Sequence, residues 1–386
     1  NRCRCGLVVC TLPNGAPAPA WRSAADQPRT TVFLYARLIF MSQQKILHIL
    51  YSGLGGHGNV FFSIVKGDKQ QVFHTEALFC GIEEVQPDYV RKCESLHIPY
   101  AFFKKSPGLD MPTLRRIYGL LKKNKPDTVF LHGPTLILPV IAYKLFSRGK
   151  RIVVRDTQAH HLKTKKEWVF LALAGLFANR LVFLTQEAKE GAVKKLKLPF
   201  LFRRTNIIPN GLDTDIYKPV PARNIDQTVV IGMQSRLQRI KDHPVLLKAF
   251  ARLKAEMPGR HLKLRIAGDG ETMTELKELA NSLNIAADVD FCGMLPEKDL
   301  VDFMQSLDIY VHATHGETMS NSIMQAMACG LPSVVSDVWG VNNMVTHGEN
   351  ALLYTPGDAN ALCNYIKDIL EHEELRKKLS LNARLH

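Results

Sequence analysis

The chain has 386 residues, of which 46% are apolar and 22% are charged. This composition excludes intrinsic disorder, a collagen-like repeat or a coiled coil as a description of the whole chain, and the length predicts two or three domains. The formal net charge of +14 is uneven: residues 1–40 carry +4, residues 41–215 carry +13 and residues 216–386 carry −3. The basic front half indicates an anionic partner, and the candidates are nucleic acid, a membrane surface and a phosphorylated substrate.

The first forty residues show no amphipathic period and contain three of the eight cysteines, and the first methionine is Met41. We interpret residues 1–40 as a leader or upstream sequence outside the native domains. A targeting segment is the alternative, although its apolar stretch at residues 6–9 is short for a signal peptide. Residues 375–386 stop within a polar helical pattern, so we expect the last domain to be truncated there.

The remaining cysteines and the apolar runs bear on the cellular compartment. Five cysteines are scattered from Cys80 to Cys363 without a CxxC pair, which favours buried free thiols in a reducing compartment. The longest apolar run extends from Trp168 to Ala178, whereas a membrane-spanning helix needs about 20 residues. We therefore expect a cytoplasmic protein, and peripheral attachment to the inner face of the cell membrane stays open.

Short apolar runs alternate with longer amphipathic ones from residue 41 onward. This alternation predicts an α/β fold with mostly parallel sheets and helices on both faces. We expect two doubly wound Rossmann-like domains facing across a cleft, at residues 41–215 and 216–386, with the breaker-rich segment 207–213 as the hinge. The predicted strands are 45–51, 128–132, 152–155, 181–184, 228–232, 263–267, 289–292, 308–312 and 332–335. The predicted helices include 113–124, 165–178, 243–256, 272–284 and 319–328.

A glycine loop, GLGGHG at residues 53–58, follows the first predicted strand, and Glu76 stands about 20 residues further on. This pattern is typical of dinucleotide-binding dehydrogenases. It also fits any tight turn that brings the backbone close to a phosphate at a helix N-terminus, or a purely structural turn. No dehydrogenase catalytic set follows, so we favour Gly55 and Gly56 as phosphate-binding positions.

Four motifs follow one another towards the other end of the chain. They are IPNGLD at 208–213, SRLQRIKD at 235–242, IAGDGE at 266–271 and GETMSNSIMQAMACGLP at 316–332. Together they resemble the retaining nucleotide-sugar glycosyltransferases of glycosyltransferase family 4, which have the GT-B fold. The resemblance covers about residues 41–386 and is strongest from 207 to 358. It implies that the front domain binds the acceptor and the back domain binds the nucleotide sugar.

The charged residues of these motifs suit the chemistry that the resemblance implies. Departure of a nucleoside diphosphate from a sugar leaves negative charge, which fixed cations stabilise. The family pattern places Arg236 and Lys241 on this diphosphate. It places Glu317, the first glutamate of a Glu-x7-Glu pattern, on the donor sugar at the reacting carbon. The alternatives are surface cations and a carboxylate that stabilises a helix dipole.

The helix expected to begin near Met319 offers further contacts with the donor. Backbone N–H groups of Met319, Ser320 and Asn321 would be unpaired at its start and could bind sugar hydroxyls or phosphate. Gln325 stands where the family has its second glutamate, which binds the ribose hydroxyls. An amide can accept one such hydrogen bond and donate another, so we expect binding to survive. An inactive relative that only binds the donor is an alternative.

The family histidine of the front domain has no clear match. The loop after the strand at 152–155 offers Thr157, His160 and His161, and we take His160 as the catalytic candidate, with His132 as another possibility. Two DxD pairs, at 213–215 and 288–290, could hold a divalent metal. Because Arg236 and Lys241 supply fixed positive charge, we expect no metal and no cofactor besides the nucleotide sugar.

The resemblance predicts a glycosyltransferase that moves a hexose-type sugar, with retention, to a glycan or lipid-linked saccharide in polysaccharide or glycolipid synthesis. A nucleotide-sugar epimerase of the same fold is the alternative from another enzyme class. Clusters of Lys and Arg beside apolar residues, at 163–170 and 194–204, suit an anionic membrane surface, though ordinary solvated helix faces would look the same. No recognition motif accompanies the charge, so we expect no nucleic-acid partner.

Overall fold

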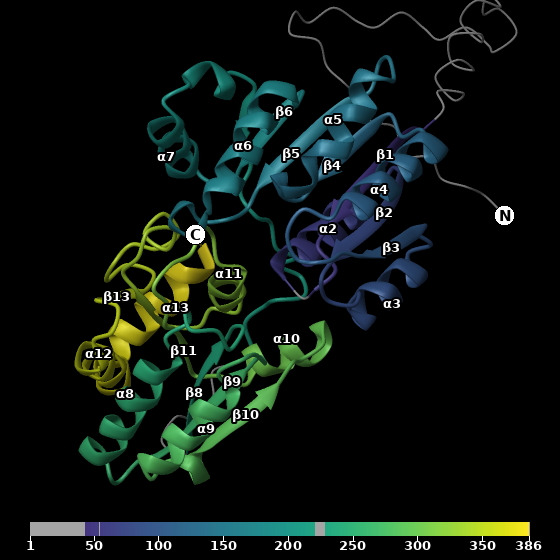
Figure 1. Ribbon diagram of the computed structural model, residues 1–386. Coiled ribbons are helices and arrows are strands. Elements are labelled where there is room, and N and C mark those ends of the chain that lie inside the picture. Colours follow the sequence, from purple (N-terminus) through teal and green to yellow (C-terminus); the bar gives the residue numbers. More distant parts are fainter. Residues whose placement is uncertain (1–42, 54, 221–227, 386) are drawn as a thin grey trace, which may run out of the picture. The chain divides into compact units, whose positions relative to one another are not determined.

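The computed structural model describes residues 43–53, 55–220 and 228–385. The leader predicted at residues 1–40 lies outside these residues. Residues Gln44–His386 form one compact unit, and its described part contains two parallel sheets flanked by helices (Figure 1). No helix in this described part is long and apolar enough to cross a membrane.

The first sheet has the strand order β3-β2-β1-β4-β5-β6-β7, and every neighbouring pair is parallel. Its strands are β1 (Gln44–Leu50), β2 (Phe73–Gly81), β3 (Tyr100–Lys104), β4 (Thr128–Leu131), β5 (Arg151–Asp156), β6 (Arg180–Phe183) and β7 (Thr205–Ile207). The intervening helices are α2 (Gly56–Gly67), α3 (Pro87–Ser95), α4 (Met111–Asn124), α5 (Ile137–Leu145), α6 (Lys165–Phe177) and α7 (Gln186–Leu196). Short 3-10 turns are η2 (Pro134–Leu136), η3 (His160–Leu162) and η4 (Pro199–Phe202).

The second sheet has the order β10-β9-β8-β11-β12-β13 and is also parallel throughout. Its strands are β8 (Thr228–Gln234), β9 (His261–Ala267), β10 (Val289–Gly293), β11 (Ile309–His312), β12 (Ser333–Ser336) and β13 (Leu352–Tyr354). Its helices are α8 (His243–Glu256), α9 (Met273–Ser282), α10 (Glu297–Gln305), α11 (Asn321–Ala328), α12 (Ala359–Glu371) and α13 (Glu373–Leu385), with the turn η5 (Ala286–Asp288).

Each sheet is covered on both faces because its strands are apolar on both sides. In β2, Leu78 and Cys80 pack with the core beside α4 and α5, while Ala77 and Phe79 pack on the opposite face with α2 and α3. Successive strand residues point to opposite faces, so one continuous apolar run feeds two core layers. This arrangement confirms the predicted pair of doubly wound Rossmann-like domains.

All nine predicted strands are present, and the five predicted helices correspond to α4, α6, α8, α9 and α11. The sequence pattern did not single out β2, β3, β7 or β13. The last three are short strands at sheet edges, and in β2 the polar residues His74, Thr75 and Glu76 follow an exposed Phe73, which weakens its apolar signal. Such strands form because the neighbouring strand supplies their hydrogen bonds, which local sequence does not report.

The strand order reverses between β1 and β4 in the first sheet and between β8 and β11 in the second. Open parallel sheets bind ligands beyond the carboxyl ends of their strands at such reversals. The glycine loop follows β1, Arg236 follows β8 and Glu317 follows β11. Topology therefore directs the search for a site to these three loops.

Candidate active site

A pocket of about 480 Å³ is lined by loops that follow strands of both sheets. Among its lining residues are Gly55, Gly56, Arg155, Asn210, Arg236, Lys241, Glu317, Met319, Ser320, Asn321 and Gln325. The structure thus gathers every residue that the sequence assigned to the donor, together with Glu317. A pocket of this size can hold a ligand of ordinary substrate dimensions.

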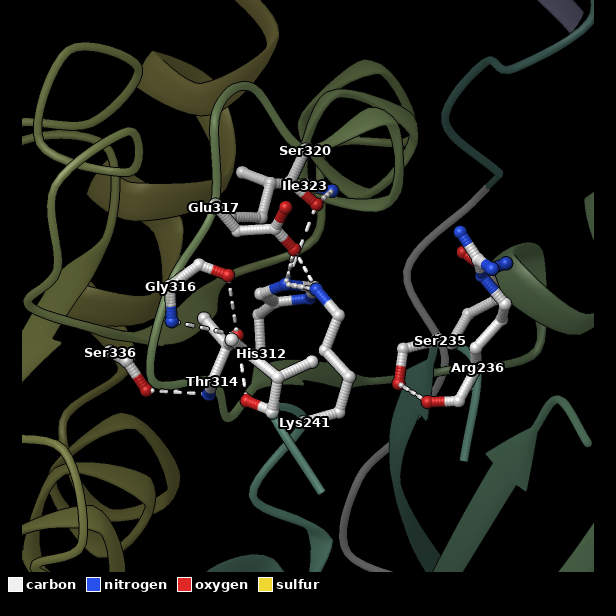
Figure 2. Close-up of polar contacts among 12 residues, drawn as sticks. Ser235, Arg236, Lys241, His312, Thr314, Gly316, Glu317, Ser320, Ile323 and Ser336 are labelled. Carbon is white, nitrogen blue, oxygen red and sulfur yellow. Dashed lines mark hydrogen bonds and ion pairs between the residues drawn. The ribbon is translucent and has the colours of Figure 1, made fainter. Parts of the chain in front are cut away.

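A cation, a carboxylate and an imidazole converge beside this pocket, which the first two of them line (Figure 2). The Lys241 Nζ forms an ion pair with Glu317 Oε1, and the His312 Nε2 lies 2.9 Å from the same oxygen. Their side chains are 14%, 16% and 0% exposed, respectively. Burial removes water from the three groups, so their mutual electrostatic interactions are stronger than on an open surface.

His312 lies in position to orient the glutamate. Its Nδ1 is 3.0 Å from the Tyr310 hydroxyl, and burial holds the pKa of His312 well below its usual range. A neutral ring accepts a hydrogen bond from Tyr310 at Nδ1 and donates one from Nε2 to Glu317, an assignment that satisfies both partners. The glutamate oxygen is therefore held by two side chains from different segments, Lys241 from the loop after β8 and His312 from the end of β11.

Burial also changes the acid–base character of Lys241. Desolvation, followed by the positive charge of Arg236, lowers the pKa of Lys241 to about 7. Arg236 itself follows β8, is exposed to solvent and stands apart from the Lys241–Glu317 contact (Figure 2). Its neighbour Ser235 is buried and contacts His243 at 3.0 Å, which fixes the strand end that carries Arg236.

The helix that was predicted to start near Met319 begins at Asn321 instead. Ser320 is its N-cap, with its hydroxyl accepting from the Ile323 N–H, and its own N–H points to the Met344 sulfur at 3.3 Å. The prediction that the Ser320 N–H is unpaired is therefore wrong, because the serine side chain prefers the capping position to the first helical turn. The helix-start N–H groups available to a ligand shift towards Asn321 and Ser322.

Gln325 is 3% exposed and faces the pocket from α11. Its side-chain N–H donates to the Tyr217 hydroxyl at 2.9 Å. The amide is thus held in a fixed orientation, with its carbonyl oxygen as the acceptor for a ligand hydroxyl.

The glycine loop begins α2, but one of its N–H groups is already occupied. The Gly55 N–H donates to the Tyr89 hydroxyl at 3.1 Å, and that hydroxyl donates back to the Gly55 carbonyl at 2.9 Å. A Cβ atom on Gly56 would lie 2.5 Å from the Asn321 side-chain nitrogen, so a larger residue there would displace the Asn321 side chain. Glu76, the acidic residue of the dinucleotide-binding alternative, does not line the pocket; it is buried in β2 and forms an ion pair with Lys45 at 2.7 Å.

His160 does not belong to the pocket lining. Its ring stacks on Trp339 with centroids 5.4 Å apart and lies 5.2 Å from the Trp168 ring. Thr157 does line the pocket, whereas His132 is buried beneath it, with Nε2 3.0 Å from His48 Nδ1.

The two DxD pairs have other partners. Asp288 forms ion pairs with Lys254 and Lys263, Asp290 forms one with Arg265, and Asp213 accepts from the Asp215 N–H at 3.1 Å. Within the described ranges, no group of three His, Cys, Asp or Glu residues could hold a metal ion. The five described cysteines are free thiols; four are buried, and Cys292 is partly exposed.

Sequence reasoning missed two parts of the site. His312 ends the predicted strand 308–312, and its only signal is a polar residue that closes an apolar run. The second part is a chain of side-chain hydrogen bonds in which Arg155 donates to Asn210, Asn210 donates to Asn321 at 2.7 Å, and Asn321 donates to the Gly56 carbonyl at 3.4 Å. These contacts join segments distant in sequence, which no local pattern reports.

Comparison with known proteins agrees with this geometry. Residues 218–386 match the family described as glycosyl transferases group 1, and residues 54–216 match the one described as glycosyltransferase family 4. The chain belongs to the group 1, family 4 glycosyltransferases of the GT-B fold. The predicted enzyme class and fold are confirmed.

Three similar proteins illustrate the range of this glycosyltransferase family. The glycosyltransferase EpsF of Bacillus subtilis is 27% identical over 77% of this chain and 80% of its own length. An Escherichia coli UDP-Gal:α-D-GlcNAc-diphosphoundecaprenol α-1,3-galactosyltransferase is 26% identical over 69% and 72%. The crystal structure of Anabaena HepE with UDP and glucose has a TM-score of 0.74 at 21% identity, over 89% of this chain and 94% of that one, which establishes a shared fold.

Proposed function

We propose that this glycosyltransferase moves a hexose from a uridine diphosphate sugar, with retention at the anomeric carbon, to a saccharide acceptor linked to a lipid diphosphate. The observation that carries the proposal is the buried Lys241–Glu317–His312 cluster in a pocket that Arg236 also lines. Fixed cations favour a leaving diphosphate, and an oriented carboxylate favours positive charge at the reacting carbon.

Each residue has a distinct part in this proposal. Arg236 and Lys241 bind the diphosphate and stabilise its charge as the bond to the sugar breaks. Glu317 faces the anomeric centre, and His312 keeps that carboxylate oriented. Gln325 binds the ribose through its carbonyl oxygen. A metal ion has no required part in this scheme, because the two cations supply the charge.

The choice of donor and acceptor is supported by the relatives. The HepE structure contains UDP and glucose, and the E. coli relative transfers galactose from UDP-Gal to a sugar on diphosphoundecaprenol. A pocket built from similar loops is expected to accept the same class of donor.

A thermal-shift panel of UDP-, GDP-, ADP- and dTDP-sugars tests the donor, and hydrolysis of the best binder tests the chemistry. The proton NMR spectrum of the first sugar released shows whether the anomeric configuration is retained. We expect UDP-sugars to raise the melting temperature most and the released sugar to keep the donor configuration. Stabilisation only by a purine nucleotide sugar, or inversion, would contradict the respective part of the proposal.

We further propose that the surface around α6, α7 and η4 rests on an anionic bilayer at the inner face of the cell membrane. Val169, Leu176 and Phe200 are 58%, 55% and 52% exposed. Seven exposed cations belong to the same segments: Lys165, Lys166, Lys194, Lys195, Lys197, Arg203 and Arg204. Exposed apolar groups ringed by cations bind anionic interfaces through both the hydrophobic effect and charge.

Vesicle flotation with phosphatidylglycerol-containing and pure phosphatidylcholine vesicles tests this surface. We expect flotation with the anionic vesicles, loss at high salt, and a strong reduction in Val169→Ser/Phe200→Ser. Leu381→Ser, which removes an equally exposed leucine from α13, is the matched control. Equal flotation of both variants would contradict the assignment of the surface.

A further inference from the structure

Arg155 is a buried cation in the pocket that the donor chemistry does not use. It lies in β5, is 5% exposed and lines the pocket. Its guanidinium donates to the Asn210 side-chain oxygen, and it forms no ion pair with any described residue. A guanidinium has five N–H donors, so most of them lack a partner in the described part of the chain.

The other cations that line the pocket either form ion pairs or are assigned to the donor diphosphate. Lys92 pairs with Asp88 at 3.0 Å and with Glu297 at 3.1 Å. Lys241 pairs with Glu317, and Arg236 is exposed where a diphosphate would arrive. Burial lowers the pKa of Arg155 only to about 10, so its side chain remains charged at neutral pH. A buried charge without a counter-ion is costly, and an anionic ligand would relieve that cost.

The surroundings of Arg155 favour an acceptor rather than a second donor group. The loop after β5 contributes Gln158, Ala159 and Leu162 to the pocket wall, and Leu162 is 44% exposed. This loop leads directly into α6, whose exposed Val169 belongs to the proposed membrane surface. Along the chain, a buried cation is therefore followed by an exposed apolar side chain of the pocket lining and then by a helix with an exposed apolar and basic surface.

The loop itself is firmly held. Asp156 and Lys163, at its two ends, form an ion pair of 3.1 Å with side chains 2% and 0% exposed. The Lys163 Nζ also donates to the Gln158 carbonyl. Loss of one partner of such a buried ion pair strongly destabilises the folded protein. The pair therefore holds the loop in one conformation beside Arg155.

We propose that Arg155 binds a phosphate group of the acceptor and makes the enzyme select phosphorylated acceptors over neutral ones. The guanidinium can present two parallel N–H groups to phosphate oxygens, the geometry that arginine favours. The acceptor sugar then lies towards Glu317, and the group beyond the phosphate follows the wall past Leu162. This inference rests on the proposed function, because it takes the donor to occupy the Arg236–Lys241 side.

Isothermal titration of the full chain saturated with UDP tests the proposal without knowledge of the acceptor sugar. The probes are geranyl diphosphate, inorganic pyrophosphate and geraniol, titrated into the wild type and into Arg155→Met, Arg155→Lys and Arg236→Met. We expect geranyl diphosphate to bind the wild type. Its affinity for Arg155→Met should be at least about tenfold lower, as for loss of a charged hydrogen bond, and its affinity for Arg155→Lys should lie between the two. Arg236→Met, whose UDP affinity should be lower and which is therefore saturated at a higher UDP concentration, should retain the wild-type affinity for the probe.

The control measurements separate this inference from the proposed function. The affinity of Arg155→Met for UDP should stay within about twofold of wild type, and its melting temperature shows whether it is folded. No binding of geranyl diphosphate to the wild type, equal binding to Arg155→Met, or an equal loss in Arg236→Met would each overturn the role of Arg155. Failure of the wild type to bind any nucleoside diphosphate would instead overturn the proposed donor.

The probes also distinguish two sources of the phosphate. Tighter binding of geranyl diphosphate than of pyrophosphate supports a lipid-linked acceptor, because the apolar wall then contributes. Equal binding of the two, both dependent on Arg155, supports a soluble phosphorylated acceptor. Binding of geraniol that matches geranyl diphosphate would overturn recognition of the phosphate altogether.

Discussion

The two sides of the pocket hold their cations in different ways. On the back side Lys241 is paired with Glu317 and flanked by His312, so its charge is balanced before any ligand binds. On the front side the one side-chain hydrogen-bond partner of Arg155 among residues 43–53, 55–220 and 228–385 is the neutral amide of Asn210, to which it donates. A paired cation must exchange or share its partner when a diphosphate arrives, whereas an unpaired one gains a partner. This difference agrees with the two proposals above, in which the back side carries the chemistry and the front side recognises the acceptor.

Removal of the Glu317 carboxylate, on the paired side, is the strongest test of this difference. We expect Glu317→Ala to lower kcat for transfer by about 10²–10³-fold or more, the range for loss of one preorganised electrostatic contact. Glu317→Gln should lose nearly as much, because it keeps the contact with His312 but not the charge. Transfer rates with the best donor, and UDP affinity by titration, measure the two effects separately. A Glu317→Ala enzyme with full activity would falsify the proposed site.

A second test uses the acidity of Lys241. With its pKa at about 7 in the free protein, Lys241 is protonated below that pH and loses its proton above it. A bound diphosphate favours the protonated form, so binding above pH 7 must take up a proton and the donor Kd must rise with pH. Uptake of one proton can raise the Kd by at most about tenfold per pH unit, since one pKa unit corresponds to about 1.4 kcal/mol.

We therefore expect the UDP Kd of the wild type to be nearly flat below about pH 6, to roughly double by about pH 7, where half of Lys241 is neutral, and to rise by about 10-fold or more from there towards pH 9. Lys241→Met should bind UDP more weakly at pH 6.5 and show a flat profile over the same range. Titration in several buffers of different ionisation enthalpy reports the proton uptake directly. A flat wild-type profile would show that another group carries the donor charge.

Gln325 offers a smaller test on the same side of the pocket. Its amide donates to the Tyr217 hydroxyl, and a glutamate there could instead accept a hydrogen bond from that hydroxyl. We expect Gln325→Glu to keep transfer within about tenfold of wild type, while Gln325→Leu raises the UDP Kd by about 5–10-fold through loss of one buried hydrogen bond. Inactivity of Gln325→Glu together with full affinity of Gln325→Leu would place the ribose elsewhere.

The sequence predicted the paired side of the pocket better than the unpaired side. Arg236, Lys241 and Glu317 stand in motifs with fixed spacing, so the positions that line the pocket could be named in advance. Arg155 sits at the end of an apolar strand, and nothing in its neighbours shows that it lines a pocket. Its partner Asn210 is reached only through the tertiary fold.

The fold itself was largely predictable because parallel strands buried on both faces give long apolar runs. Details set by side-chain competition were not. The start of α11 depended on whether Ser320 would cap the helix or join it, and sequence patterns resolve such boundaries poorly. The surroundings of His160 depended on Trp339, a residue of the other Rossmann-like domain.

This last contact gives the smallest predicted effect and decides the role of His160. Trp339 stacks on His160, and the next residue, Gly340, has φ +89° and lies so close to the Glu317 carbonyl that an added Cβ would be 2.2 Å from it. The stack therefore bears on the loop that carries Glu317. An aromatic pair contributes about 0.5–1.5 kcal/mol, so we expect Trp339→Ala to lower kcat by about 3–10-fold and leave the UDP Kd within twofold.

The matched change His160→Ala should have the same small effect, and the double variant should be no worse than either single one, because both remove one interaction. Trp339→Phe, which keeps an aromatic face, should restore most of the rate. If His160 acts directly on the substrate, its removal must instead cost about 10²-fold or more, while Trp339→Ala stays mild. The ratio of these two rates separates a residue that positions the Glu317 loop from one that takes part in the reaction.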